Sequence, residues 1–174
     1  MEFEFKSLGI KDIVLIKRKK FSDLRGELIK EFETTPFVKV FEPLFKEEYI
    51  SISKKNVIRG LHYQIDPKPQ GKLVSVIRGK ILEVAVDIRK ESPTYLKSVS
   101  VELSSDMLLS LWIPPGFAHG FLTLSDESIV LTRCNNEYDP LLEKGIRWND
   151  PKIGVNWPIN EPILSEKDKN WELL

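Results

Sequence analysis

The chain has 174 residues, in which 26 lysines and arginines balance 26 aspartates and glutamates, with 41% apolar residues, two histidines and one cysteine. This length is typical of one domain, and this apolar share is enough for a packed core, so general disorder is excluded. Zero formal net charge argues against non-specific nucleic-acid binding, and a single cysteine excludes an internal disulfide or a thiolate metal cluster within one chain.

Short strands separated by turn residues are predicted along the chain. In chain order they are Ile10–Ile16, Glu27–Phe32, Glu48–Ser53, Val57–Tyr63, Lys72–Arg89, Lys97–Leu103, Ser110–Ile113, Gly120–Leu124 and Ser128–Asn135. Such a series of strands, with no helices between them, predicts an all-β sandwich or barrel rather than a parallel α/β fold. We expect it to occupy residues 1–174 as a single domain.

Five segments outside the regular strand pattern have predictions of their own. Asp23–Gly26 and Pro114–Gly116 predict turns, because Gly and Pro favour turn conformations. Arg78-Gly79 interrupts an apolar run and predicts a tight hairpin. Thr34–Glu42 lacks a clear period and is predicted as a loop or a short helical turn, and Ser165–Leu174 has a weak helical pattern.

Charged residues within apolar strands leave two interpretations open. Alternate residues from Leu82 to Ile88 share an apolar face, whereas Glu83 and Asp87 face the other way. Asp87 is then either a buried hydrogen-bonding carboxylate or a residue on a solvated face. Lys72, at a predicted strand start, is either a solvated lysine or part of a pocket.

Both histidines lie in segments that suit a structural role as well as a functional one. Strand alternation puts His62 on the opposite face from Arg59 and Leu61. Two prolines and two glycines around His119 describe a rigid turn, which a site and a buried corner both require. Two histidines, with no second one at metal-ligand spacing, make a catalytic metal the minor alternative, and we expect no metal site.

The location of the protein follows from what the sequence lacks. A lone cysteine is typical of the reducing cytoplasm, and no apolar run reaches the roughly 18–20 residues that span a membrane. The first six residues alternate charged and aromatic side chains and have no apolar signal-peptide core. We expect a cytoplasmic protein with neither a membrane nor a nucleic acid as partner.

Several motifs together resemble the dTDP-4-dehydrorhamnose 3,5-epimerase family, in their order and spacing. They are Arg59–Gln64, Gln70–Val74, Val84–Arg89, Ser92–Thr94, Trp112–Phe121 and Gly145–Pro151. The resemblance extends almost without a gap from Val57 to Trp157. It implies a double-stranded β-helix (a cupin-type jelly roll) with short peripheral helices, a homodimer, and no metal or organic cofactor.

The resemblance also implies roles for particular residues. His62 would be the catalytic base, Asp168 would pair with it and orient the imidazole, and Lys72 would stabilise an enolate. The residues implied to contact a nucleotide-sugar substrate are Arg25, Arg59, Lys72, His119, Tyr138, Glu143 and Lys167, with Arg25 reaching the nucleotide of a partner subunit.

The chemistry of a 4-keto sugar suits these residue types. The ketone acidifies the protons on its neighbours C3 and C5, and a neutral imidazole takes such a proton near pH 7. A carboxylate behind the ring holds its tautomer, an ammonium group stabilises the enolate oxygen, and a guanidinium binds a diphosphate in a bidentate fork.

The chain departs from the family pattern at three places. The family proton donor is a tyrosine, and its position falls on Thr132, whose hydroxyl is far less acidic than a phenol. Glu47–Tyr49 replaces a Gln-Asp-Asn run, and Lys30 replaces a glutamate. The last two changes leave the nucleotide base open between thymine and guanine, cytosine or uracil.

Three explanations for Thr132 therefore compete. Another tyrosine, namely Tyr49, Tyr63 or Tyr138, or a water supplies the proton; the enzyme epimerises only one carbon; or the scaffold performs another activity. The leading hypothesis is a 3,5-epimerase of a nucleotide-linked 4-keto-6-deoxy sugar. The alternatives are a C3-only epimerase or ketoisomerase, and a sugar-nucleotide-binding cupin without turnover.

Overall fold

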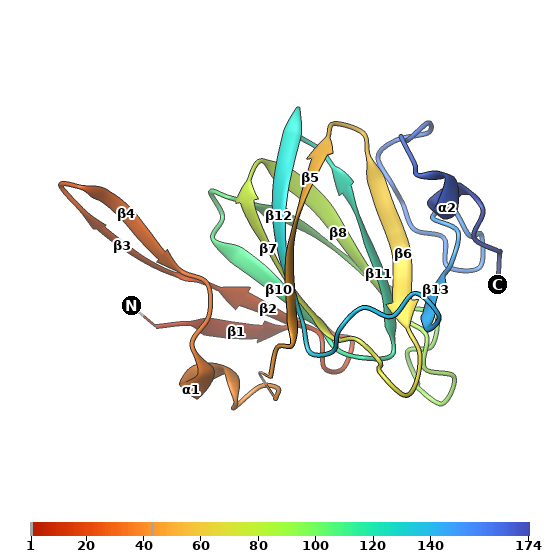
Figure 1. Cartoon of the computed structure of the whole chain (residues 1–174), viewed down its shortest axis with the longest axis horizontal. Helices are drawn as coiled ribbons and strands as arrows, with labels where there is room; N and C mark the ends of the chain where they lie inside the picture. The colour runs from red at the N-terminus through yellow and green to blue at the C-terminus, as the bar shows by residue number, and fades with distance from the viewer. Residues whose placement is uncertain (1, 43) are drawn as a thin grey trace.

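The computed structural model describes residues 2–42 and 44–174, and its strands form two facing antiparallel sheets and a separate hairpin (Figure 1). In spatial order, the six-stranded sheet consists of β1 (Glu4–Ser7), β2 (Val14–Lys17), β10 (Leu109–Ile113), β7 (Lys72–Arg78), β12 (Glu127–Cys134) and β5 (Glu47–Lys54). The five-stranded sheet consists of β13 (Glu143–Gly145), β6 (Ile58–Gln64), β11 (Phe117–Thr123), β8 (Lys80–Asp87) and β9 (Ser98–Ser104). The remaining elements are the hairpin strands β3 (Lys19–Asp23) and β4 (Gly26–Lys30) and the short helices α1 (Thr34–Phe37) and α2 (Glu166–Lys169).

Strands that follow one another along the chain alternate between the two sheets over most of the fold. β5, β7 and β12 belong to the six-stranded sheet, whereas β6, β8 and β11 belong to the five-stranded one. The chain therefore winds as a double-stranded β-helix whose two sheets enclose a common interior. The predicted all-β fold with short peripheral helices is confirmed.

The hairpin predicted at Arg78-Gly79 is wrong. β7 pairs with β10 and β12, whereas β8 pairs with β9 and β11, so the two strands lie in different sheets. The chain crosses between the sheets at Gly79, which has a φ of +80°, a conformation that favours glycine. A Cβ there would lie 2.2 Å from the Glu127 carbonyl oxygen. The local sequence predicts a turn, but only the tertiary fold decides which strands the turn connects.

The predicted strand Ile10–Ile16 is wrong in its first half, because a turn occupies that part. β2 begins only at Val14, and the preceding strand β1 is not predicted. Within the turn, Asp12 has a φ of +75° and the Ile13 N–H donates to the Ile10 carbonyl oxygen at 3.3 Å. Both isoleucines are buried by the turn, so their spacing resembles strand alternation without being part of a strand.

Both faces of the five-stranded sheet are buried. The alternation of apolar and charged residues in β8 therefore does not separate a buried face from a solvated one. One face meets the six-stranded sheet across a core that includes Ala85, and residues 146–164 cover the other face, where Val84 packs. The charged side chains of β8 consequently point into the interior, and Glu83 and Asp87 are both fully buried.

Of the two interpretations left open for Asp87, the structure supports the first: the residue is a buried, hydrogen-bonded carboxylate. It accepts hydrogen bonds from Nε and Nη2 of Arg89 at 2.9 and 2.8 Å, and from the hydroxyl groups of Ser92 and Thr94 at 2.6 Å each. Burial alone would raise the pKa of Asp87, but these donors hold it well below its usual value. The cluster anchors the loop after β8 to the end of that strand.

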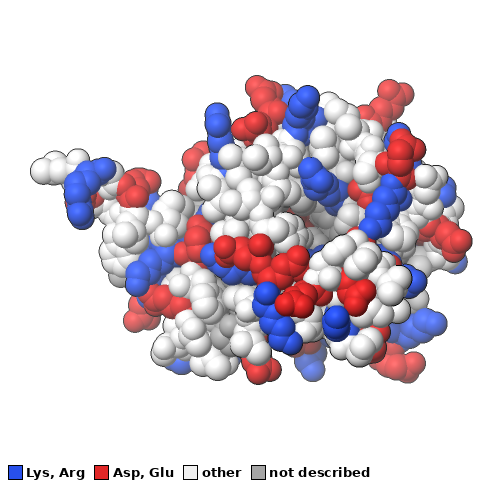
Figure 2. Space-filling view, in the orientation of Figure 1, with Lys and Arg blue, Asp and Glu red and all other residues white. Residues whose placement is uncertain are grey.

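The hairpin β3–β4 projects from the body of the molecule (Figures 1 and 2). Its turn at Asp23–Gly26 is confirmed, whereas β3 is not predicted, because most of its residues are polar. α1 confirms the short helical turn within Thr34–Glu42, and α2 covers less than the weak helical pattern at the C-terminus. In the part of the chain that the structure describes, no helix is long and apolar enough to cross a membrane.

Candidate active site

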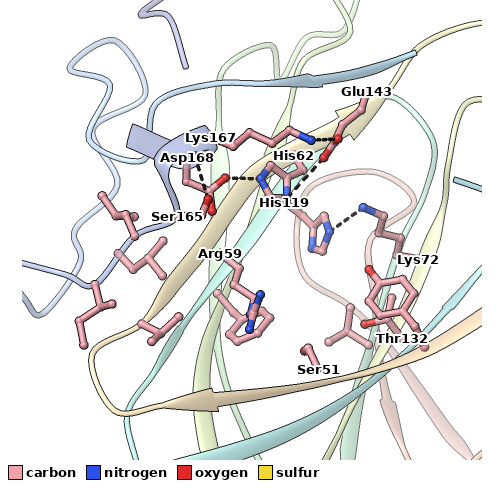
Figure 3. A pocket seen from close by; sticks show the side chains of 17 residues that line it. Ser51, Arg59, His62, Lys72, His119, Thr132, Glu143, Ser165, Lys167 and Asp168 are labelled. Carbon is pink, nitrogen blue, oxygen red and sulfur yellow. Dashed lines mark hydrogen bonds and ion pairs between the residues drawn. The ribbon is translucent and has the colours of Figure 1, made fainter. Parts of the chain in front are cut away.

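A cavity of about 510 Å³ opens between the two sheets, a size typical of small-molecule sites (Figure 3). The six-stranded sheet contributes Tyr49, Ser51, Lys72, Val74 and Thr132; the five-stranded sheet contributes Ile58, Arg59, His62, His119, Phe121 and Glu143; the chain outside both sheets contributes Val57, Ile163, Leu164, Ser165, Lys167 and Asp168. Of the site residues implied by the resemblance, all line this cavity except Arg25 and Tyr138.

A bulge in β6 brings Arg59 and His62 to the same side of the sheet, so their predicted placement on opposite faces is wrong. In the pairing with β11, His62 lies opposite His119 and Arg59 opposite Phe121, which leaves two residues of β6 facing only Gly120. One extra residue in a strand shifts the phase of its alternation. The strands approach closely because Gly120 has no side chain: a Cβ there would lie 2.4 Å from the Arg59 carbonyl oxygen.

A carboxylate from the C-terminal part of the chain contacts His62. Nε2 of His62 lies 2.5 Å from Oδ1 of Asp168, and Nδ1 lies 4.0 Å from Oε1 of Glu143 (Figure 3). Because an ionised carboxylate only accepts hydrogen bonds, the short contact assigns the ring proton to Nε2 and leaves Nδ1 able to accept one. The His62 side chain is 25% exposed, so a molecule in the cavity can reach this nitrogen.

A capped helical turn positions Asp168. The Asp168 N–H donates to the hydroxyl of Ser165 at 3.0 Å, which is the N-cap interaction of α2. The Trp171 indole N–H donates to Oδ1 at 3.3 Å, and the Gly60 N–H donates to Oδ2 at 3.5 Å. Burial alone would raise the pKa of Asp168, but hydrogen bonds with His62, Ser165 and Gly60 hold it below its usual value. The carboxylate is therefore ionised at neutral pH.

Three buried titratable groups form a chain beside the cavity. Nζ of Lys72 lies 2.9 Å from Nε2 of His119, and Nδ1 of His119 lies 2.8 Å from Oε1 of Glu83. Burial lowers the pKa values of Lys72 and His119 and raises that of Glu83, and the nearby Lys72 and His62 lower the pKa of His119 further. His119 is thus neutral, accepts a hydrogen bond from Lys72 and donates one to Glu83. This chain of contacts fixes the position of the lysine head group.

Glu143, Lys167 and Tyr138 form a cluster at the rim. Lys167 pairs with Oε2 of Glu143, and the Tyr138 hydroxyl donates to the same oxygen at 2.6 Å. Burial alone would raise the pKa of Glu143, but Lys167 and Tyr138 hold it below its usual value. Tyr138 lines an adjoining pocket of about 300 Å³, which also touches His62 and Lys72. The rim cluster is therefore continuous with the cavity.

The two arginines of the prediction lie in different parts of the molecule. Arg59 donates from Nε to the Ser53 hydroxyl at 2.9 Å and from Nη2 to the Ile52 carbonyl oxygen at 3.2 Å, which keeps its guanidinium at the cavity wall. Arg25 lies at the tip of the β3–β4 hairpin, is paired with Asp23, and has a side chain 91% exposed. The structure does not bring Arg25 to the cavity of its own chain.

Glu83 is the main residue of the site that the sequence prediction omits. The sequence does show that Glu83 lies on the same face of its strand as Ala85 and Asp87. Alternation alone, however, does not distinguish a buried face from a solvated one. Tyr49, considered from sequence only as one of three alternative tyrosines, lies opposite Thr132 in the pairing of β5 with β12. Strand pairing of this kind is not visible from either segment alone.

The arrangement combines an imidazole base backed by a carboxylate, an amino group across the cavity, and a guanidinium. This set is able to take a proton from an acidified carbon and to stabilise the resulting oxyanion. Within residues 2–42 and 44–174, no group of three or more His, Cys, Asp or Glu side chains is placed to hold a metal ion.

Known proteins resemble the chain over nearly its whole length. Residues 7–174 match the family described as dTDP-4-dehydrorhamnose 3,5-epimerase. The enzyme of that name from Shigella flexneri is 46% identical over 167 residues, which cover 92% of this chain and 90% of the relative. A dTDP-4-dehydrorhamnose 3-epimerase from Streptomyces niveus is 31% identical, over 96% of this chain and 82% of the relative.

Solved structures share the fold. The dTDP-4-dehydrorhamnose 3,5-epimerase of Bacillus anthracis, with TDP and PPi bound, superposes with a TM-score of 0.96 at 35% identity and covers 99% of this chain and 100% of its own. The Legionella pneumophila dTDP-6-deoxy-D-glucose-3,5-epimerase, in complex with dTDP-4-keto-L-rhamnose, has a TM-score of 0.94 at 37% identity, covering 99% and 93%. Because sequence and fold agree over almost all of its length, the chain belongs to the dTDP-4-dehydrorhamnose 3,5-epimerase family, an epimerase family of the cupin fold.

Proposed function

We propose that the protein epimerises C3 and C5 of dTDP-4-dehydro-6-deoxy-D-glucose to give dTDP-4-dehydro-L-rhamnose, a reaction of deoxysugar biosynthesis. The observation that carries this proposal is the His62–Asp168 pair facing Lys72 across a cavity large enough for a sugar ring. The reaction is assigned to the cytoplasm, where a free cysteine such as Cys134 stays reduced.

The proton transfer begins at His62. Nδ1 takes the proton from C3 or C5, the C–H bond breaks, and its electron pair moves into the enolate formed with the C4 ketone. The imidazole becomes an imidazolium, which the Asp168 carboxylate at 2.5 Å stabilises. Since the pKa of Asp168 is held below its usual value, the carboxylate keeps its charge while the ring gains one.

Lys72 is assigned to the ketone oxygen of the substrate and Arg59 to its diphosphate. The Lys72 head group, fixed by His119, lies where it stabilises negative charge on the ketone oxygen. Arg59 lines the same cavity with its guanidinium held by Ser53 and is placed against the diphosphate.

The test is proton NMR in heavy water with 4-keto-6-deoxy-glucose linked to dTDP, UDP, GDP or CDP. With the dTDP sugar, we expect deuterium to enter at both C3 and C5 and the L-rhamno product to appear. Faster turnover of a sugar linked to another nucleotide would contradict the dTDP assignment. The other nucleotides are included because Lys30 and Glu47–Tyr49 depart from the family pattern. Tight binding without label at any carbon would instead establish a non-catalytic binding protein.

A C3-only epimerase is the second candidate. Two observations favour it: Thr132 stands at the family proton-donor position, and the Streptomyces niveus relative is named a 3-epimerase. The same spectra distinguish the candidates, because a C3-only enzyme would give product labelled at C3 and leave C5 unlabelled.

We further propose a homodimer in which the β3–β4 hairpin of each subunit reaches the cavity of the other. The hairpin projects from the body (Figure 2). Its apolar side chains Phe21, Leu24 and Leu28 are exposed. An exposed apolar patch of this kind is typical of a protein–protein interface, and a second copy of the chain would bury it. Arg25 at the hairpin tip would then supply a guanidinium to the partner's diphosphate.

Mixing two inactive variants tests this dimer. We expect Arg25→Ala and His62→Asn to be impaired separately. Their mixture should recover about a quarter of wild-type activity after reassociation, because about half of the dimers are then heterodimers and each heterodimer has one of its two sites intact. Wild-type homodimers mixed with themselves serve as the control for the reassociation step. Absence of recovery in proven heterodimers, or a monomer in sedimentation experiments, would contradict the exchange of hairpins.

A further inference from the structure

We propose that Tyr49 is the proton donor of the reaction and delivers its phenol from β5 to the wall of the cavity opposite His62. This inference rests on the proposed epimerase function and adds a catalytic residue to it.

Inversion of a carbon requires two groups on opposite sides of the sugar. The base removes a proton from one face, and configuration changes only if another acid returns a proton to the other face. His62 belongs to the five-stranded sheet. The donor must therefore come from the opposite wall, where Lys72 and Thr132 lie across the cavity from His62 and Asp168 (Figure 3).

Four side chains with a transferable proton line that wall: Tyr49, Ser51, Lys72 and Thr132. The hydroxyls of Ser51 and Thr132 are aliphatic and much weaker acids than a phenol, whose ordinary pKa is about 10. Lys72 is held by His119 at 2.9 Å and is already assigned to the ketone oxygen. Tyr49 is the remaining acid on this wall.

The other three tyrosines of the chain are placed less well. Tyr138 lies outside the main cavity, and its proton is engaged in a 2.6 Å hydrogen bond to Glu143. Tyr63 also lies outside it and packs against the core cluster beneath residues 146–164. Tyr95 lines a separate pocket that contains neither His62 nor Lys72.

The pairing of β5 with β12 explains why a threonine at position 132 is compatible with catalysis. Tyr49 and Thr132 are directly opposite in the register, so their side chains are neighbours on one face with Cβ atoms about 4.5–5.5 Å apart. In this chain the phenol is therefore on β5 instead of on the neighbouring strand β12, and the small side chain of Thr132 leaves room for it.

With this assignment, every proton that is removed or added in the reaction has a donor and an acceptor. His62 gains the proton of the breaking C–H bond, and the enolate carbon takes the proton of the Tyr49 hydroxyl to form the new C–H bond on the opposite face. The phenolate then recovers a proton from solvent, and the imidazolium releases one. A phenol, whose ordinary pKa is about 10, is protonated at neutral pH, so Tyr49 enters each cycle able to donate.

Tyr49→Phe tests the assignment, because it removes one hydroxyl and keeps the ring. We expect product formation to fall by about 10²-fold or more, while deuterium still enters the substrate with unchanged configuration, since His62 returns solvent-derived label to the same face. Tyr95→Phe is the matched control and should retain wild-type turnover. The double variant Tyr49→Phe/Thr132→Tyr places a phenol on the opposite strand and should recover about tenfold over Tyr49→Phe.

Two results would overturn the inference. One is a Tyr49→Phe enzyme that forms product within about threefold of the wild-type rate; the other is a variant that loses exchange together with product, which would assign Tyr49 to binding. Failure of the proposed function is recognised separately, because the wild-type protein would then form no epimerised product at all.

Discussion

Replacing His62 by asparagine is expected to abolish deuterium exchange at both C3 and C5, with turnover reduced by about 10²- to 10⁴-fold, the range of general acid–base catalysis. Asparagine has no basic nitrogen, and its shorter side chain does not reach the position from which Nε2 contacts Asp168 at 2.5 Å. The loss should therefore appear in kcat, with little change in the binding of dTDP. Rapid-quench assays measure turnover, and NMR measures deuterium exchange at C3 and at C5 separately.

The exchange pattern separates His62 from Tyr49. The His62 variant should lose both exchange and product, whereas Tyr49→Phe should lose product alone. Thermal unfolding of the His62→Asn protein checks that the fold is intact, and calorimetric binding of dTDP checks the site. Exchange at the wild-type rate at either carbon would show that another base acts there.

Replacing Asp168 by asparagine is expected to reduce kcat by about 10²- to 10⁴-fold, with KM changed much less. The carboxylate accepts hydrogen bonds from His62, Trp171 and the Gly60 N–H. His62 and Trp171 both donate to Oδ1, whereas Gly60 donates to Oδ2, so the amide oxygen of asparagine takes the Oδ1 position and its NH₂ group faces the Gly60 N–H. The neutral amide then no longer stabilises the positive charge that the imidazole gains.

Glu166→Gln is a matched control on the same helical turn, because Glu166 is 83% exposed and pairs only with Lys169 among the described residues. It should keep activity within about twofold. A D168N enzyme with wild-type kcat would contradict the orienting role of Asp168.

Asp168 also makes a prediction about stability and pH. Its pKa is below the usual value in the folded protein, so its ionised form stabilises the fold above the unfolded-state pKa of about 3.9 and loses this effect as pH falls through the lower folded value. The difference in unfolding free energy between wild type and D168N should therefore shrink on acidification below about pH 4. Denaturant titrations at pH 6 and near pH 3 measure it.

The sequence by itself determined the fold class, the turn at Asp23–Gly26 and the chemical types at the site. These features depend on local rules: strand period, turn residues, and motifs such as those containing His62 and Lys72, which carry their chemistry in a few consecutive positions. They led to the family that the comparisons show.

Only the tertiary structure decided how those parts meet. The crossing at Gly79, the bulge that turns Arg59 and His62 to one side, and the approach of Asp168 across 106 positions all depend on contacts between distant segments. Local alternation describes a strand but not its partner or its bulges, because register is set by packing in the assembled sheets. For the same reason, Thr132 is an anomaly in the sequence, and the structure places Tyr49 directly opposite it.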